Sequence, residues 1–349
     1  MSVEETTGAW DAATGMPAEQ QQGAVGQLLS YADYVVIAVC THSLGVLISA
    51  FGLSSNMVNI LVFYKVGFAS TSSISLFSLA ICDIFIVVFV LVTLLTSHPW
   101  FPSDDHMIIS MRDVSIVASL VFFSLPGMGA WITAIVAVER SCCIAFPIKV
   151  KQIFTRKTIA ILIGGVVIYQ IASGLPQSFG TRLVWRVSPL TNRTRVAYQL
   201  EKPTMVFLSL VATYSLPITL CYFIVSVGTI FLIRKFKESR KLQSLLSSRN
   251  SDSNKTLSAK DMRLIRSAIF ICTIFIIGST PGILAIFIQL VYPSMHVYNP
   301  VLGNIHQVWL DVGLVFQALN SSVNIFVHLT TGSKFKSTFK EMFLNQGKK

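Results

Sequence analysis

The chain carries the sequence Glu139-Arg140-Ser141-Cys142-Cys143-Ile144-Ala145-Phe146-Pro147 directly after an uncharged run of 25 residues, 114–138. A run of that length predicts a helix that crosses a membrane, because about 20 apolar residues span the hydrocarbon core. An acid and an arginine at the end of such a helix place an ion pair at a membrane face, where charged groups are costly and commonly functional. The alternative for this pair is anchoring at the membrane interface.

The composition extends this interpretation to the whole chain. Of the 349 residues, 53% are hydrophobic and only 12% are charged, and the mean hydropathy is +0.66, which exceeds what a soluble domain needs to fill its core. Seven uncharged or nearly uncharged runs are each long enough to cross a membrane as a helix. These runs are 34–64, 66–97, 114–138, 158–181, 203–233, 267–291 and 301–329. We therefore predict an all-α protein, a bundle of seven transmembrane helices.

Lysine and arginine fall mainly on one side of this bundle. That side holds 21 of the 27, whereas the opposite loops hold six, and the first 33 residues hold five acids and no base. By the positive-inside rule the N-terminus is extracellular and the tail cytoplasmic. The expected parts are an acidic extracellular segment at 1–33, a transmembrane domain at 34–329, and a cytoplasmic amphipathic helix with a tail at 330–349. The net charge of +11 comes from the lysines and arginines that mark the cytoplasmic side. Membrane lipids and not nucleic acid are therefore the expected partners.

The segment after the last run has a helical repeat of aromatic residues. Phe335, Phe339 and Phe343 recur every four positions among lysines. That spacing puts the three rings on one face of a helix and the charges on the other. It predicts a short amphipathic helix that lies in the inner membrane interface.

The runs also carry polar and proline motifs in a fixed order. They are Asn59 in the first run, Leu79-Ala80-Ile81-Cys82-Asp83 in the second, Glu139-Arg140-Ser141 with Pro147 after the third, Pro217 in the fifth, Phe275 six residues before Pro281 in the sixth, and Asn320-Ser321-Ser322-Val323-Asn324 in the seventh. Any one of these is weak evidence, since proline and asparagine also serve helix packing. In this order and spacing they resemble the rhodopsin family of G protein-coupled receptors over about residues 34–343. The resemblance implies a plasma-membrane protein that transmits ligand binding to a heterotrimeric G protein.

The resemblance and the charges together predict an activation switch at the cytoplasmic face. Arg140 can pair with Glu139 and also reach Asp261 at the start of helix six, and outward movement of helix six would break that link. In the family the opened crevice receives the C-terminal helix of a G protein α subunit. The switch residues are then Glu139, Arg140, Asp261, Asn324, Phe275 and Pro281, and the G protein contacts are Arg140, Pro147 and Ile148.

A second polar group is expected in the middle of the bundle. Asp83 is costly there unless it is partnered, and it is predicted to be the only acid deep in the bilayer. In the family's arrangement Asn59, Asn320, Ser321 and Asn324 converge on it, where they hold water or a sodium ion. The alternative is a structural polar network without an ion, because Gly129 replaces the serine that completes the family's sodium shell.

The ligand pocket is likewise implied by the family's geometry. Its expected lining is Phe122, Phe123, Pro126, Phe207, Val211, Gly282, Ile286, Leu314 and Gln317. This apolar set suits an uncharged or weakly polar ligand, although the aromatic residues could equally pack helix against helix. Phe122 stands where an amine receptor needs a carboxylate, and Ala318 stands where an opsin needs a lysine. Protonated monoamines and light are therefore not the expected stimuli.

Several departures from the family's pattern indicate a closer likeness. Ser115 replaces the cysteine at the start of helix three, and helix seven ends in Asn324-Ile325-Phe326-Val327-His328 without the usual proline and tyrosine. This combination resembles the divergent chemosensory-type receptors of molluscs, with a neuropeptide receptor of the same fold as the alternative. The sequon at Asn192 lies in a predicted extracellular loop and is expected to be glycosylated.

The main rival from another class is a small channel or transporter. Transport commonly leaves several ionisable sites at mid-membrane, duplicated in two halves, whereas this chain shows a single cluster around Asp83. An enzyme is not expected, because no nucleophile–base pair and no metal-ligand spacing appears in the runs. His42, His306 and His328 are predicted to be isolated on different helices, so no cofactor is expected apart from the candidate sodium ion.

Overall fold

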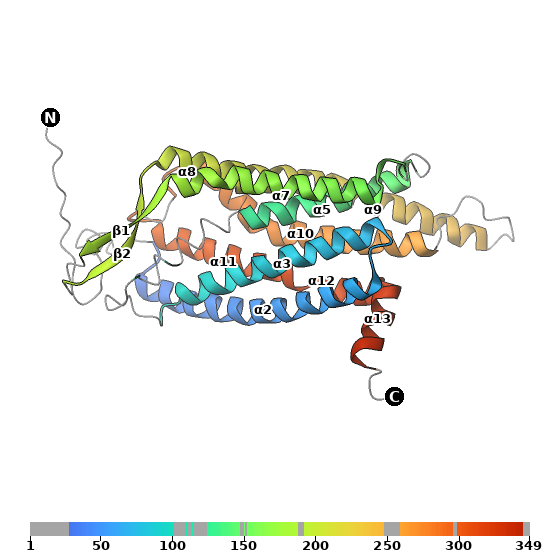
Figure 1. Cartoon of the computed structure of the whole chain (residues 1–349), viewed down its shortest axis with the longest axis horizontal. Coiled ribbons are helices and arrows are strands. Elements are labelled where there is room, and N and C mark those ends of the chain that lie inside the picture. Colours follow the sequence, from blue (N-terminus) through green and yellow to red (C-terminus); the bar gives the residue numbers. More distant parts are fainter. Residues whose placement is uncertain are drawn as a thin grey trace.

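The computed structural model describes residues 28–100, 109, 114, 124–146, 150, 152–187, 192–247, 259–295 and 299–344, without the side chains of residues 242–247 and 259–261. Within these ranges, seven helical segments are long and apolar enough to cross a membrane. The prediction of an all-α bundle of seven helices is confirmed, and the chain has the architecture of a multi-pass membrane protein. Figure 1 shows the long helices lying side by side.

The helices begin close to where the hydrophobic runs predict. Their bounds are α2 Tyr31–Val66, α3 Thr71–Thr96, α5 Ser124–Ala145, α7 Arg156–Phe179, α8 Pro203–Leu210, α9 Leu216–Ser247, α10 Ala259–Val291, α11 Gly303–Ser322, α12 Asn324–Thr331 and α13 Ser333–Phe343. A π-helical turn, η1 Val211–Ser215, joins α8 to α9, so these three form one membrane-length segment, and α11 and α12 form another.

Short polar residues set the helix starts. The hydroxyls of Ser30, Ser70 and Thr155 each accept a hydrogen bond from a backbone N–H in the first turn of α2, α3 and α7. These N-caps satisfy donors that a helix leaves open at its start. Gly67, with φ of 81°, ends α2, a conformation that favours glycine over any other residue.

One element was not predicted, a β-hairpin between the fourth and fifth membrane segments. Strand β1 Thr181–Val187 pairs antiparallel with β2 Thr194–Leu200, in a register that sets Thr181 opposite Leu200. Exposed Asn192 lies in the connection with φ of 54°, which asparagine tolerates better than most residues. We call this end of the bundle the hairpin end; it lies at the left in Figure 1.

Helix α13 turns across the opposite end of the bundle, which we call the α13 end (Figure 1). The Phe335 ring is buried there against Phe63 and His328, at ring centroid distances of 5.0 and 5.3 Å. Lys65 of α2 pairs with Glu341 of α13 at 2.9 Å. The predicted helix over the phenylalanine repeat is confirmed, and one of its aromatic residues docks onto the bundle.

The inside of the bundle is packed and holds buried polar side chains, whereas its outer surface carries large apolar side chains. One core cluster joins α3, α5, α10 and α11 through residues such as Ile86, Ile132 and Ile271, and a second joins α5, α9 and α10 around Phe275. Large apolar side chains also cover the outer surface, with Ile168 and Val227 among the most exposed. An apolar exterior around a packed core that also holds buried polar groups is the pattern of a protein that uses lipid as its solvent.

Candidate functional site

The Glu139–Arg140 pair is buried at the α13 end. An Arg140 guanidinium N–H donates to Glu139 Oε1 at 2.9 Å, and the two side chains are 10% and 2% exposed. The hydroxyls of Thr71 and Ser72, in the first turn of α3, complete the group: Thr71 donates to Glu139, and Ser72 accepts from Arg140. A charged pair this deeply buried is stable only when such hydrogen bonds accompany it.

Helix α10 faces this pair across a small cavity. The cavity is about 20 Å³, and Leu264, Ser267 and Ala268 of α10 line it together with Arg140. The predicted partner Asp261 lies on α10, but its side chain is outside the described part of the structure, as are Pro147 and Ile148. Among the described side chains, the polar partners of Arg140 are therefore on α5 and α3 and not on α10.

Asp83 lies buried at mid-helix and contacts only part of the predicted group. Its Oδ2 accepts a hydrogen bond from Asn324 Nδ2 at 2.8 Å. Asn320 lines a cavity of about 10 Å³ together with Asp83. Asn59 donates instead to Asn56 Oδ1 at 3.2 Å, whereas the buried Ser321 hydroxyl lies beside the Asp83 carboxyl as predicted.

The cavity beside Asp83 matches one small polar occupant. A volume of about 10 Å³ corresponds to roughly one water molecule. Thr133, Ser279 and Gln317 bring further oxygen atoms to its wall, while Gly129 contributes none from a side chain. Oxygen donors of this kind suit either water or a hard monovalent cation.

Phe275 and Pro281 lie on α10 as predicted, in different surroundings. Phe275 is buried among Ile218, Cys221 and Val225 of α9 and residues of α5. The carbonyl of Pro281 accepts a hydrogen bond from Trp309 Nε1 of α11 at 3.0 Å.

The residues predicted to line a ligand pocket do not meet in one cavity. Phe122 and Phe123 are outside the described residues. Pro126 and Gln317 line the cavity beside Asp83, which is too small for an organic ligand. Of the others, Leu314 packs against the α3–α11 core, Gly282 lies next to Tyr214, and Val211 and Ile286 are half-buried.

The prediction for Phe207 needs correction. Its side chain is 64% exposed and faces outward, whereas Val206 is buried. The physical reason is η1, because a π-helical turn inserts one residue and shifts the inward face of everything before it by one position. A prediction that continues a regular α-helix back from Pro217 selects the wrong neighbour.

Side chains of α7 satisfy the carbonyls that η1 displaces. Tyr169 O–H donates to the Ala212 carbonyl at 2.8 Å. With its amide nitrogen toward η1 and its amide oxygen toward α5, Gln170 donates to the Thr213 carbonyl at 3.2 Å and accepts from the Met128 N–H at 3.3 Å. Gly127 permits this approach, since a Cβ there would lie 2.3 Å from the Thr213 carbonyl oxygen. The turn is therefore built into the packing of α5, α7 and η1.

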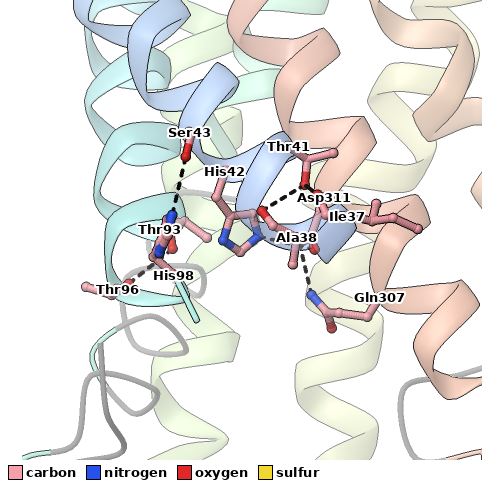
Figure 2. A network of polar contacts seen from close by, with 10 residues as sticks. All are labelled: Ile37, Ala38, Thr41, His42, Ser43, Thr93, Thr96, His98, Gln307 and Asp311. Atoms are coloured by element: carbon pink, nitrogen blue, oxygen red, sulfur yellow. Dashed lines mark hydrogen bonds and ion pairs between the residues drawn. The ribbon is translucent and has the colours of Figure 1, made fainter. Parts of the chain in front are cut away.

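A polar network at the hairpin end was missed (Figure 2). His42 Nε2 of α2 lies 3.2 Å from Asp311 Oδ2 of α11, and both side chains are almost fully buried. Gln307 Nε2 donates to the other Asp311 oxygen at 3.0 Å. His98, just after α3, places its ring 5.8 Å from that of His42 and its Nε2 3.5 Å from Ser43 Oγ.

This network overturns two predictions. His42 is not isolated, and Asp83 is not the only acid deep in the bundle, because Asp311 is buried about 12 Å along α11 from its start. The His328 ring packs edge-on against Phe63 at 5.0 Å, which is an aromatic contact and not an ionisable pair. The signal that could have found the network was present: two ionisable residues in separate apolar runs each need a partner.

Comparison with known proteins adds no family to this description. No protein-family model matches the chain, and no curated protein matches it.

Proposed function

We propose that this chain is a receptor of the rhodopsin type, of the chemosensory kind, which couples an extracellular ligand to a heterotrimeric G protein. The observation that carries the proposal is the buried Glu139–Arg140 pair, which is hydrogen-bonded within α5 and to α3 and faces α10 across a small cavity. A bundle that only needed stability would gain little from a charge at this depth. Movement of α10 would make the Arg140 guanidinium accessible to a binding partner.

The proposed mechanism is outward movement of α10 at the α13 end. Arg140 keeps its partners Glu139 and Ser72 when α10 moves, because both belong to α5 and α3. Movement would widen the 20 Å³ cavity lined by Leu264 and Ala268 and expose the guanidinium. An exposed guanidinium with donors to spare binds carbonyl and carboxylate groups at the end of a partner helix. The partner in this proposal is the C-terminal helix of a G protein α subunit.

The group around Asp83 has a second role in the proposal. The Asp83–Asn324 hydrogen bond joins α3 to the start of α12, just where the seventh segment breaks between α11 and α12. Water or a sodium ion in the adjacent cavity would be held by Asp83 and by the oxygen atoms of Asn320 and Thr133. Loss of that occupant on activation would couple the middle of the bundle to the α13 end.

The orientation in this proposal sets the hairpin end outside the cell and the α13 end in the cytoplasm, at the plasma membrane. Asn192 is exposed in the hairpin connection and is available for glycosylation. The sequon at Asn254 lies on the other side of one membrane segment. Glycosidase treatment of membranes tests the orientation: Asn192→Gln should abolish the mobility shift, and loss of the shift in Asn254→Gln would reverse the topology.

Guanine-nucleotide exchange tests the function. Cells that express the chain with a promiscuous G protein are screened with waterborne odorants and invertebrate peptides, and exchange is measured at matched surface levels. Arg140→Ala should reduce stimulated exchange to the level of cells without the receptor, while Arg263→Ala, an exposed cation on α10, should leave it unchanged. Full exchange in Arg140→Ala would contradict the mechanism. A membrane current without exchange would favour a channel.

A further inference from the structure

A groove lies on the outer surface between α9 and α10, towards the α13 end. Its volume is about 460 Å³, and its lining is Ile233, Phe236, Lys237, Arg240, Arg266, Ile269 and Phe270. The side chains of Phe236 and Ile269 at its base are held in place, because they pack against the buried cluster of Val136, Leu232, Ile265 and Ala268. The groove is thus an apolar trough with three cations at one of its ends.

The two helices contribute matching halves to this groove. Arg240 lies over the Phe236 ring at 5.9 Å, and Arg266 lies over the Phe270 ring at 5.5 Å. Because α9 and α10 are antiparallel, each arginine lies one turn beyond its phenylalanine in the direction of the α13 end. Stacking on a ring holds each guanidinium in place while its donors stay open to a ligand.

The position of the groove along the helices is equally specific. On α9 the uncharged stretch ends at Ile233 and the next residue is Arg234, and on α10 Arg266 is followed by uncharged residues up to Val291. The groove therefore straddles the boundary between hydrocarbon and headgroup depth on both helices. Lys237, Arg240 and Arg266 are all exposed, and none forms an ion pair with another described side chain.

We propose that this groove binds one anionic phospholipid, with an acyl chain along Phe236, Ile269 and Phe270 and a headgroup carrying more than one negative charge against Lys237, Arg240 and Arg266. Charge complementarity selects this occupant: three cations from two helices match a phosphorylated headgroup, and the adjoining apolar trough matches its chain. A soluble phosphate would leave the apolar part unused. That the lipid belongs to the inner leaflet rests on the proposed function, whereas the binding itself does not.

Native mass spectrometry of the purified full-length chain tests the site. Equal amounts of phosphatidylinositol 4,5-bisphosphate, phosphatidylserine or phosphatidylcholine are added in detergent, and the fraction of lipid-bound protein is measured. The bisphosphate lipid should bind most and phosphatidylcholine least. The variant Lys237→Gln/Arg240→Gln/Arg266→Gln should bind the bisphosphate lipid at least tenfold more weakly.

A charge-matched control keeps the result specific. The variant Arg234→Gln/Lys235→Gln/Arg263→Gln removes three neighbouring cations outside the groove and should bind as the natural chain does. Equal loss in both variants would mean non-specific attraction and would overturn the site. So would inositol trisphosphate competing as well as the intact lipid, which would assign a free phosphate site. Because no G protein takes part, these outcomes are independent of the nucleotide-exchange test.

Discussion

The two ends of the bundle hold buried charges in opposite ways. At the α13 end, Glu139 and Arg140 are neighbours on one helix, and their further partners Thr71 and Ser72 belong to α3. At the hairpin end, His42 and Asp311 come from different helices, so their contact exists only while α2 and α11 stay together. A pair within one helix survives the movement of another helix, whereas a pair between helices opposes separation.

The hydrogen bonds between helices follow the same division. Along the α2–α11 seam, Asn56 Nδ2 donates to the Ser321 carbonyl at 2.6 Å and Ser55 Oγ to the Ser322 carbonyl at 3.0 Å. The bonds that tie α10 to its neighbours through Trp309 and Tyr222 lie next to Pro281, away from the α13 end. Nearer that end, Leu264, Ser267 and Ile271 of α10 line the cavity beside Arg140, and the described hydrogen bonds of Arg140 go to α5 and α3. In the proposed mechanism α10 is therefore the helix that moves, and α2–α11 is the fixed frame.

The largest expected effect comes from breaking the frame. Asp311→Ala leaves the buried His42 ring and the Gln307 amide without their carboxylate partner, and each polar group left unsatisfied in the interior costs about 1–3 kcal/mol. The melting temperature of the purified protein in detergent should fall sharply. His42→Leu/Asp311→Leu should be less destabilised than Asp311→Ala, because the double variant removes both buried partners and leaves only the part-buried Gln307 amide without its acceptor.

The double variant also decides how the pair acts. If it melts as early as Asp311→Ala, the loss comes from packing and not from the charge contact. If Asp311→Ala melts like the natural chain, the two ends of the bundle do not differ as described, and α2–α11 is not a frame.

A smaller effect is expected where α10 meets α11. A Cβ added at Gly278 would lie 2.6 Å from the Asn320 Cβ, so Gly278→Ala forces the two helices apart at a cost of about 1–3 kcal/mol. Basal nucleotide exchange should rise as the melting temperature falls. Gly164→Ala on α7 is the matched control: nothing lies within 4 Å of its Cβ, and alanine stabilises a helix by about 0.5–1 kcal/mol over glycine.

A rise in exchange for both glycine variants would show that any change of stability alters basal activity. A fall in melting temperature without a rise in exchange for Gly278→Ala would show that α10 is not the moving helix.

The sequence predicts the membrane segments of this protein better than it predicts the contacts between them. Hydrophobic run length is a local property, so the seven membrane segments and α13 could be located without the structure. The His42–Asp311 contact joins residues from the first and last segments, and no spacing rule relates them. The π-turn at Val211–Ser215 carries no glycine or proline to announce it, yet it changes which residue faces inward. Local sequence patterns do not predict contacts or helix rotations that are set by packing between segments distant in the sequence.

The hairpin is an intermediate case. Residues 181–187 and 194–200 contain valine, leucine, threonine and aromatic residues around a connection with Pro189 and Asn192, which is a strand–turn–strand signal. The hydrophobic runs on either side predict only a loop here, because run length carries no information on the structure between two membrane helices. Among candidate site residues, the Glu139–Arg140 pair was found because its members are adjacent, and the predicted ligand pocket was misplaced at Phe207 because it depends on helix rotation.

Removing the predicted charge on α10 should have a still smaller effect. An ion pair near the surface contributes about 0–1 kcal/mol, so Asp261→Ala should raise basal exchange only a few-fold and leave the response to agonist intact. Exchange at matched surface levels measures it, with Glu238→Ala as the control acid, since Glu238 pairs with Lys235 on α9. An increase of a hundredfold would mean that α10 is tied as firmly as α2–α11, and the contrast between the two ends would disappear.

The smallest effect is a pH dependence confined to the hairpin end. His98 is 8% exposed, its Nδ1 accepts the Trp100 backbone N–H at 3.2 Å, and the charged groups that face it are His42 and, beyond it, Asp311. Burial, and then the charge of His42, lower the pKa of His98 below its ordinary 6.5. Between that lowered pKa and about pH 6.5 the folded protein therefore binds fewer protons than the unfolded chain, so this histidine costs stability as the pH falls through that range and costs none above it. His98→Gln removes the titration and leaves His42 in place. On going from pH 7.5 to 5.5, the melting temperature of the natural chain should fall further than that of the variant. If it falls less, the fold stabilises protonated His98, and its surroundings raise its pKa where we expect them to lower it.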